Sequence, residues 1–416
     1  MTWHIVNWIA GSILALAWFS RIVEAAIGMP RIADIALPKW DRHPATPGGE
    51  PRVTIVVPAR NEEDHIRETL TRLLALEYSN YEVIAVNDRS TDRTGQIMDE
   101  VAAENPCGAD TLVRVPAASV PHAGTGRNVL PTRLKVLHVS ELPSGWLGKT
   151  HAMWTAAQQA IGDWLLFTDA DVLFKPDSLR RAIAYAEEEK ADHVVLFPRM
   201  IMKRPGERMM IAFFQALFVF GHRPWKVADP DARDHMGVGA FNMVRRSVYE
   251  AAGTYVALRM EVLDDMKLGK VVKNAGFAQR NVFGEDLISI YWAKGAFGIV
   301  NNLTKNFFAV LSFQWWRALG SVVGLGFLNL GPFLGVWLAH GWIRASYGIA
   351  LVSIFVIYCG MSSRSAVRPY YFFLHPISTS LFMYTLLRSM FVTIRNDGIV
   401  WRGTKYALED LRDGMV

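Results

Sequence analysis

Cysteine and charge are scarce in this sequence, and each scarcity excludes a class of protein. The 416 residues include two cysteines, Cys107 and Cys359, which lie far apart in unlike surroundings and so exclude a disulfide scaffold or a zinc finger. The 44 basic and 39 acidic residues give a net charge of +5, too mild to indicate a nucleic-acid-binding protein. With 51% hydrophobic and only 20% charged residues, the chain is too apolar to be intrinsically disordered.

Two long segments are almost free of charge. No Asp, Glu, Lys or Arg occurs in Met1–Ser20, and no acidic residue occurs in Gly320–Ile394. A membrane-spanning helix needs about 20 predominantly apolar residues, and Trp3–Ile22 has this length. Because no Lys or Arg precedes it, we interpret this stretch as a retained span rather than a cleavable signal peptide. Three further candidate spans are Leu319–Trp342, Tyr347–Gly360 and Tyr371–Ile394.

The basic residues beside these stretches predict an orientation. Arg21, Arg31 and Lys39 follow the first span, which favours a cytoplasmic central region. Three more spans would place the Arg364/Arg368 loop in the cytoplasm but the C-terminal tail outside. That tail carries Arg395, Arg402, Lys405 and Arg412, which prefer the cytoplasm. The middle candidate is short for a span, so the number of crossings stays open.

The central region alternates strand and helix patterns. The predicted strands are Val53–Val57, Glu82–Val86, Leu134–Val139, Trp164–Thr168 and His193–Phe197. Helical patterns follow them: one capped by 61–64 with its apolar face at Ile66, Leu70, Leu73 and Leu74, one from Ser90 to about Glu104, one after Lys149, and one over Pro176–Glu189. This alternation predicts an α/β domain with a mainly parallel, Rossmann-like sheet.

Polar residues gather where predicted strands end. Pro58, Asp88, Asp169 and Asp171 all follow strands, and ligands bind at that edge of an open α/β sheet. The Asp-Ala-Asp pair can bind a hard divalent cation, although it can also be a turn whose carboxylates satisfy loop amides. Asp88 can accept hydrogen bonds from a nucleobase or a ribose, and so can Asp92, unless Asp92 caps the next helix.

These residues carry a family resemblance. Segments 57–63, 86–92, 148–149 and 168–171 resemble, in order and spacing, the signature of family 2 glycosyltransferases with a GT-A fold. Gly237–Arg246 resembles the acceptor-side glycine loop of that family, and Val262–Met266 resembles its catalytic motif.

The resemblance implies a role for each matching residue. Contacts to a nucleotide diphosphate sugar, preferentially a UDP-sugar, are expected from Pro58, Glu62, Asp88, Asp92, Lys149 and Asp169. Asp169 and Asp171 are expected to hold Mg²⁺ or Mn²⁺, and Asp265 is expected to be the general base. The acceptor side is expected to include Gly239, Ala240, Phe241 and Asp264. A single base predicts inversion, since a retaining double displacement needs a second carboxylate. Asp264 or Asp265 can alternatively cap the helix that follows them.

A further match departs from the family pattern. Gln314-Trp-Trp-Arg317 resembles the Gln-x-x-Arg-Trp motif of processive members, but Ala318 replaces the final Trp. Gln314 and Arg317 are still expected to bind the diphosphate, whereas processivity is put in doubt. The alternative interpretation is a membrane-interface segment over Phe307–Trp316.

The acceptor is expected to be a membrane lipid. Gly145–Lys149 and Val262–Asp265 most resemble the hopanoid-associated, carotenoid and ceramide glycosyltransferases. The apolar stretch Met209–Phe220 suits a helix lying in the membrane interface, or else a buried core helix. The tail segment Trp401–Tyr406 resembles one that crosses the site in related lipid-modifying members. A polysaccharide synthase and a non-enzymatic membrane protein on a GT-A scaffold are the competing hypotheses.

The sequence therefore predicts five regions along the chain. They are an N-terminal anchor (1–28), a linker (29–51), a GT-A domain (52–318, with a nucleotide half to 200 and an acceptor half from 201), transmembrane helices (319–395) and a tail (396–416).

Overall fold

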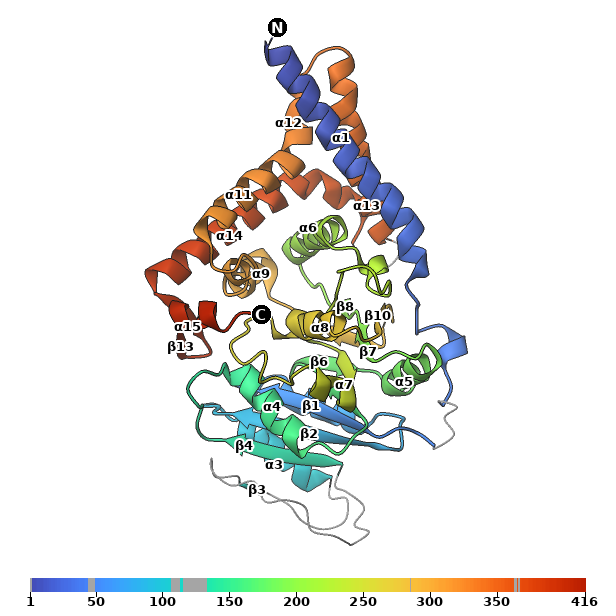
Figure 1. Ribbon diagram of the computed structural model, residues 1–416, viewed down its shortest axis with the longest axis vertical. Coiled ribbons are helices and arrows are strands. Elements are labelled where there is room, and N and C mark those ends of the chain that lie inside the picture. Colours follow the sequence, from blue (N-terminus) through green and yellow to red (C-terminus); the bar gives the residue numbers. More distant parts are fainter. Residues whose placement is uncertain are drawn as a thin grey trace. The chain divides into compact units, whose positions relative to one another are not determined.

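The computed structural model describes residues 2–43, 49–105, 113–114, 133–284, 286–362, 365 and 367–416, so Cys107 and Arg364 lie outside the described residues. The chain forms two compact units (Figure 1). We call them the helical unit (1–32, 200–226 and 291–412) and the sheet unit (33–199, 227–290 and 413–416). The predicted acceptor half, 201–318, is thus divided between the two units rather than belonging to one domain.

The sheet unit is built on an eight-stranded sheet with the order β10-β7-β9-β5-β1-β2-β4-β3. Its strands are β1 (Val53–Ala59), β2 (Tyr81–Asp88), β3 (Val113–Arg114), β4 (Leu134–Val139), β5 (Trp164–Phe167), β7 (His193–Leu196), β9 (Asn242–Arg245) and β10 (Gln279–Val282). Strands β5, β1, β2, β4 and β3 pair in parallel, whereas β9 runs antiparallel between β5 and β7. The predicted mainly parallel sheet is confirmed. A smaller sheet joins β6 (Val172–Phe174), β11 (Ile288–Ile290) and β8 (Arg199–Met200).

Helices cover both faces of the large sheet (Figure 1). They are α2 (Ile66–Leu74), α3 (Thr94–Glu104), α4 (Gly148–Gln159), α5 (Ser178–Glu188), α7 (Arg246–Ala251) and α8 (Asp264–Asn274). Every residue of β1 is buried, because Ile55 and Val57 pack into one core and Val56 into the core on the opposite face. Two-sided burial explains why this strand is a continuous apolar run rather than an alternating one.

Two local predictions need correction. Helix α2 begins after His65 with no side-chain cap, whereas Asn61 accepts a hydrogen bond from the Thr91 backbone, so segment 61–64 does not cap the helix as expected. The predicted linker 29–51 is partly structured, since Ile35 and Trp40 are buried in the core of the sheet unit. The Ile35 backbone N–H also donates to the Phe283 carbonyl at 2.8 Å. The apolar side chains of Ile35 and Trp40 thus hold this segment against the sheet unit.

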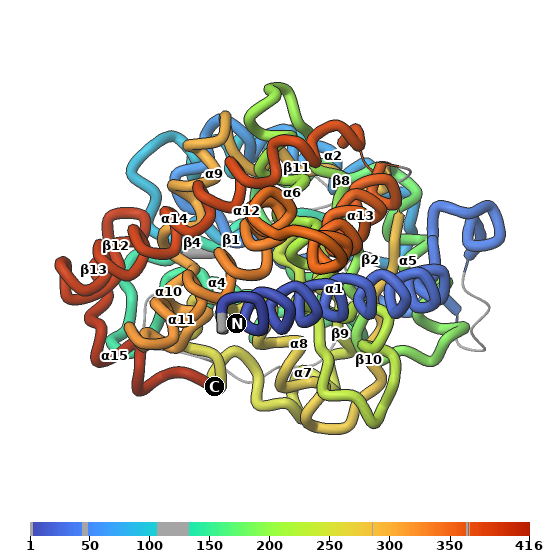
Figure 2. The backbone as a smooth tube through the Cα atoms, turned by 90° about the horizontal axis from the view of Figure 1, so that it is seen from above, coloured from blue at the N-terminus to red at the C-terminus, as the bar shows by residue number. Residues whose placement is uncertain are grey.

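Among its described residues, the helical unit contains four helices long and apolar enough to cross a membrane, namely Trp3–Arg31, Trp315–Leu338, Trp342–Ser362 and Pro369–Arg395. The middle C-terminal candidate, expected to be short, is helix α13 with 21 residues and spans about 30 Å at 1.5 Å per residue. Within this unit, α1 (Thr2–Gly28) lies along α13 and α11 (Trp315–Leu325) lies along α14 (His375–Arg395), as the two views show (Figure 1, Figure 2). Large apolar side chains such as Trp342, 92% exposed, are suited to lipid contact.

The segment 209–220 belongs to helix α6 (Pro205–Gly221), which packs inside the helical unit. Phe213 is fully buried, and its ring lies 5.1 Å from that of Phe382 on α14. Glu207, at the start of α6, accepts hydrogen bonds from the Tyr291 hydroxyl and the Gly295 backbone. These contacts show that one face of α6 is buried, as expected from the alternative interpretation of this segment as a core helix. The hydrogen bonds of Glu207 also join the segment that begins at Tyr291 to the same unit.

The other α-helices and the strands of the helical unit are shorter. They are α9 (Gly295–Thr304), α10 (Phe307–Val310), α12 (Gly331–Leu338), α15 (Leu408–Asp413) and the hairpin of β12 (Gly398–Trp401) and β13 (Thr404–Ala407). Arg402 and Gly403 both have positive φ angles, 49° and 79°, the requirement of a two-residue type I′ hairpin loop. In this hairpin the Trp401 ring lies under the Lys305 ammonium at 4.5 Å. Its predicted position across the catalytic site stays a prediction.

Candidate active site

The Asp-Ala-Asp loop is held firmly at the carboxyl edge of the sheet. β5 ends at Phe167, and the Thr168 hydroxyl then donates to the Ala240 carbonyl at 2.8 Å. The Asp169 backbone N–H donates to the Gly239 carbonyl at 3.0 Å, so the loop is tied to the segment that leads into β9. A Cβ atom at Gly239 would lie only 2.5 Å from Asp169 Oδ2, which explains the glycine at this position.

Lys149, in the first turn of α4, reaches two carboxylates. Its Nζ lies 2.8 Å from Asp169 Oδ1 and 3.4 Å from Asp264 Oδ2. Burial by itself lowers the pKa of Lys149, but the neighbouring aspartates outweigh burial and raise this pKa, so the amine is charged. Because the ammonium lies closer to Asp169 than to Asp264, Asp264 is only partly compensated. Burial therefore raises the pKa of Asp264 to about 7, with Lys149 opposing the shift.

The carboxylate of Asp265 is oriented by backbone N–H groups. Oδ2 accepts a hydrogen bond from Gly239 at 2.8 Å, and Oδ1 accepts one from Met266 at 2.7 Å. Burial raises the pKa of Asp265, while Lys149 and these two hydrogen bonds oppose the increase. Each carboxylate oxygen has a second lone pair and can still accept a proton from a bound hydroxyl.

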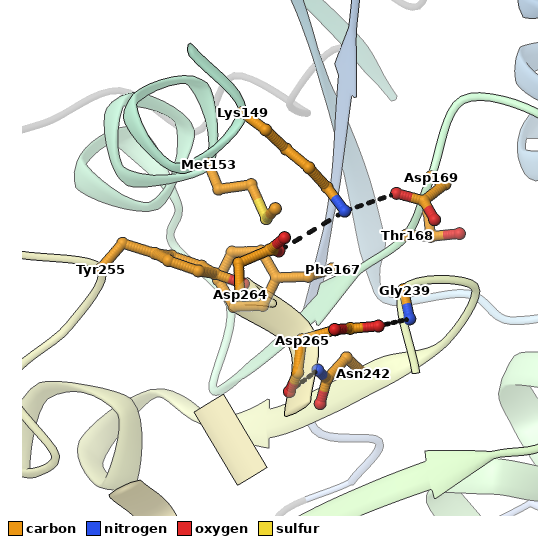
Figure 3. Close-up of a pocket in the computed structure, with 10 residues that line it drawn as sticks. All are labelled: Lys149, Met153, Phe167, Thr168, Asp169, Gly239, Asn242, Tyr255, Asp264 and Asp265. Atoms are coloured by element: carbon orange, nitrogen blue, oxygen red, sulfur yellow. Dashed lines mark hydrogen bonds and ion pairs between the residues drawn. The ribbon is translucent and has the colours of Figure 1, made fainter. Parts of the chain in front are cut away.

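These groups line one small pocket within the sheet unit (Figure 3). The lining residues are Lys149, Met153, Phe167, Thr168, Asp169, Gly239, Asn242, Tyr255, Asp264 and Asp265. The structure thus brings together five residues that the sequence selected: Lys149, Asp169, Gly239, Asp264 and Asp265. Sequence reasoning missed Met153, Phe167 and Tyr255, which belong to no quoted motif. Asn242 lies inside the Gly237–Arg246 segment that resembles the glycine loop, and this position was the signal that could have identified it as a pocket residue.

Asp171 and Glu62 lie at the same edge of the sheet. Burial, together with the negative charges of Asp169 and Glu62, raises the pKa of Asp171 to about 6. Carboxylates that repel one another in this way form a site that a cation would stabilise. Among the described residues, no group of three or more His, Cys, Asp and Glu side chains suits a metal ion. A cation held here would therefore need ligands from water or a bound diphosphate.

Asp88 and Asp92 are both engaged with the protein. Asp88, at the end of β2, is buried, and Arg89 donates to its two carboxylate oxygens at 2.7 and 3.2 Å. A Cβ at Gly148 would lie 2.3 Å from Asp88 Oδ2, so the start of α4 closes over this carboxylate. Asp92 accepts hydrogen bonds from the Thr94 backbone and hydroxyl at 2.9 and 2.6 Å. These bonds hold the loop, but the cap residue of α3 is Arg93 and no side chain caps this helix, so the capping role expected as the alternative for Asp92 is not observed. Nucleotide contacts by either aspartate stay predictions.

The other predicted residues occupy different surroundings. Pro58 lies in β1 beside Val86 of β2. Phe241 is fully buried and its ring packs 6.1 Å from that of Phe174, so its side chain lies in the core instead of at the pocket. Asp264 does not cap α8, because the cap residue is Leu263 and no side chain caps the helix. Gln314 and Arg317 lie in the helical unit, and their contact with a diphosphate stays a prediction.

The fold is an α/β fold, and the pocket gathers a lysine and several carboxylates at the carboxyl edge of its sheet, where ligands of open α/β sheets bind. Residues 51–296 match the family described as Glycosyltransferase like family 2. The chain belongs to this family. It is a glycosyltransferase with a GT-A fold that transfers a sugar from a nucleotide sugar.

Two relatives are named 4,4′-diaponeurosporenoate glycosyltransferase. The one from Staphylococcus aureus (strain bovine RF122 / ET3-1) is 22% identical over 405 residues, which cover 94% of this chain and 99% of the relative. The one from Staphylococcus haemolyticus (strain JCSC1435) is 22% identical over 249 residues, which cover 59% of this chain and 58% of the relative.

A solved structure shares the fold over most of the chain. It is a mannosyltransferase from Pyrobaculum calidifontis in complex with GDP-Man and Mn²⁺, with a TM-score of 0.50 and 18% sequence identity. The similarity covers 93% of this chain and 98% of that protein.

Proposed function

We propose that the protein transfers one sugar, with inversion at the anomeric carbon, from a nucleotide diphosphate sugar to a membrane lipid. The observation that carries the proposal is the Asp265 carboxylate, which two backbone N–H groups hold in the same pocket as Lys149 and Asp169. In the proposed reaction Asp265 accepts the proton of an acceptor hydroxyl. The hydroxyl oxygen bonds to the anomeric carbon as the bond from that carbon to the diphosphate breaks.

The surplus of carboxylates supports a divalent cation at the edge of the sheet. Asp169 and Asp171 fit Mg²⁺ or Mn²⁺, since hard cations take oxygen ligands and Mg²⁺ typically keeps several waters or phosphate oxygens. A cation bound there neutralises negative charge on the departing diphosphate. Lys149, charged and 2.8 Å from Asp169, adds positive charge at the same place. With a cation bound to Asp169, the Lys149 ammonium would be placed to contact the diphosphate instead.

Inversion follows from assigning one base. The pocket also contains Asp264, which is partly protonated near neutral pH because of its raised pKa and which faces Lys149. A double displacement needs an ionised nucleophilic carboxylate at the anomeric carbon. We therefore assign the base to Asp265 and no nucleophilic role to Asp264. NMR of the first product formed should show the opposite anomeric configuration to the donor, and retention would overturn this assignment.

The lipid acceptor and the membrane location rest on the helical unit and on the relatives. Its apolar helices carry large exposed side chains, including Trp337 and Trp342. The relatives are named for a carotenoid acid, diaponeurosporenoate, which is an apolar acceptor of the kind a membrane dissolves. Arg31 and Lys39 follow helix α1, and Arg21 lies in its C-terminal third, which supports a multi-pass protein in the cell membrane with the sheet unit in the cytoplasm.

The test uses the full-length protein in lipid nanodiscs with Mg²⁺ or Mn²⁺. Labelled UDP- and GDP-sugars are offered with extracted lipids, and products are identified by mass spectrometry as lipids carrying one added hexose or hexosamine. Asp265→Asn should lower transfer by at least about a hundredfold. Asp99→Asn, on α3 beside His138 and outside the pocket, should not. Equal transfer by wild type and Asp265→Asn would refute the base, and long polymeric products would indicate a polysaccharide synthase instead.

A further inference from the structure

Three polar side chains lie fully buried on neighbouring strands of the large sheet. They are His193 on β7, Asn242 on β9 and Gln279 on β10, each at most 1% exposed. Gln279 pairs directly with His193, and Asn242 pairs with Val195, two residues along β7. Since alternate residues of a strand share a face, all three side chains lie on one face of the sheet. Burying such groups is costly unless every one of them is hydrogen-bonded.

The three side chains form a directional chain of hydrogen bonds. Asn242 Nδ2 donates to the Asp265 carbonyl at 3.1 Å, which leaves Asn242 Oδ1 to accept from His193 Nε2. His193 is then the tautomer with a free lone pair on Nδ1, which accepts from Gln279 Nε2 at 2.6 Å. Gln279 Oε1 accepts in turn from the Met236 backbone N–H at 2.8 Å. Every link pairs one donor with one acceptor only while His193 is neutral.

Both ends of the chain reach the backbone that builds the pocket. One end is the Asp265 carbonyl, and the other is Met236, three residues before the Gly239 that donates to Asp265 Oδ2. These two segments touch, since a Cβ at Gly237 would lie 1.7 Å from the Asp265 carbonyl oxygen. The buried chain therefore joins both segments to the rigid strands beneath them.

We propose that His193, Asn242 and Gln279 are positioning residues that fix the Asp265 carboxylate by fixing its backbone and the loop that donates to it. The inference rests on the proposed role of Asp265 as base. A purely stabilising role would not require polar groups here, because well-packed apolar residues of similar volume serve stability about equally well. A misplacement of about 1 Å at the reacting groups can cost about a hundredfold in rate, which gives the network a chemical consequence.

The experiment compares variants of the full-length protein in nanodiscs. His193→Leu and Asn242→Leu remove the hydrogen bonds at similar volume, whereas His193→Gln retains one donor and one acceptor. Thr54→Val is the matched control. Thr54 is a buried polar residue of the same sheet that bonds Glu82 at 2.6 Å and lies outside the pocket. For each variant we would measure kcat, the donor KM and the thermal midpoint.

The proposal expects kcat to fall about 10- to 100-fold in both Leu variants, with donor KM within about twofold of wild type and substantial recovery in His193→Gln. Thr54→Val should lower the thermal midpoint comparably and leave kcat nearly unchanged. The proposal is overturned if kcat falls no more in the Leu variants than in Thr54→Val, or if donor KM changes as much as kcat. If one Leu variant does not fold, the other carries the comparison. Asp265→Asn, measured in parallel, separates the two hypotheses, because its full activity would refute the base assignment whatever the network does.

Discussion

Acid should destabilise the sheet unit through His193. Burial lowers the pKa of this imidazole from 6.5 to about 4, although its bond to Asn242 opposes the shift. The folded state therefore resists a proton that the unfolded chain accepts. Stability is unaffected by His193 above about pH 6.5, falls as the pH decreases from 6.5 toward 4, and reaches its full loss below the folded pKa.

The size of the effect follows from the two pKa values. At 1.36 kcal/mol per unit, the shift corresponds to about 3 kcal/mol of unfolding free energy lost below pH 4. Between pH 7.5 and pH 5 the loss is about 2 kcal/mol, since one extra proton binds to the unfolded state over most of that range. For a domain of this size, the thermal midpoint should fall by about 4 to 8 °C from this group alone.

The assay compares wild type with His193→Gln, which cannot titrate. Thermal midpoints are measured in detergent from pH 8 to pH 4.5, and only the difference between the two proteins is interpreted. Carboxylates that titrate in this range, including Asp171 and Asp264, affect the stability of both proteins, so their contributions cancel in the difference. Wild type should lose stability relative to the variant as the pH falls. A difference that stays constant over the whole range would refute the buried, neutral imidazole.

Three further predictions concern the site. Gly239→Ala should weaken Mn²⁺ binding at least about tenfold, because the new Cβ would lie 2.5 Å from Asp169 Oδ2. Electron paramagnetic resonance measures the affinity, and an unchanged value would argue against Asp169 as a ligand. Gly148→Ala should raise the donor KM about tenfold, because its Cβ would displace Asp88; an unchanged KM would remove Asp88 from the donor site. Lys149→Met should lower kcat about 10²- to 10³-fold, as loss of one charge-stabilising donor does, and an effect below threefold would contradict its place at the diphosphate.

Much of the fold was predictable because the signals were local. The central strands are buried on both faces and therefore are uninterrupted apolar runs, and the helices between them show a clear apolar face. β9 and β10 were missed because at least half of the four residues in each strand are polar or charged, including the buried Asn242 and Gln279 at their first positions. Those side chains, Asn242 and Gln279, look unsuited to a strand interior until the neighbouring strands provide their partners.

The boundary of the catalytic domain was predicted less well. Residues 201–318 follow the glycosyltransferase motifs in order, but α6 and α9 pack with the apolar helices and 227–290 pack with the sheet. The apolar face of a helix does not indicate whether the helix will pack against a sheet or against other helices. The domain of α6 and α9 could therefore be predicted only from their position along the chain, which is an unreliable signal.

The sequence by itself determined the class of fold, the apolar helices at both ends and the carboxylates that are candidates for the site, because strand ends, helix length and motif order are properties of neighbouring residues. Only the tertiary structure decided how these carboxylates differ. Asp264 faces Lys149 and has a pKa near 7, Asp265 is held by Gly239, and Asp92 serves its own loop. The structure alone also joined His193, Asn242 and Gln279 into one chain beneath Asp265. Burial, hydrogen-bond direction and distance between charges arise from residues far apart in sequence, and these are the quantities that give identical side chains different chemistry.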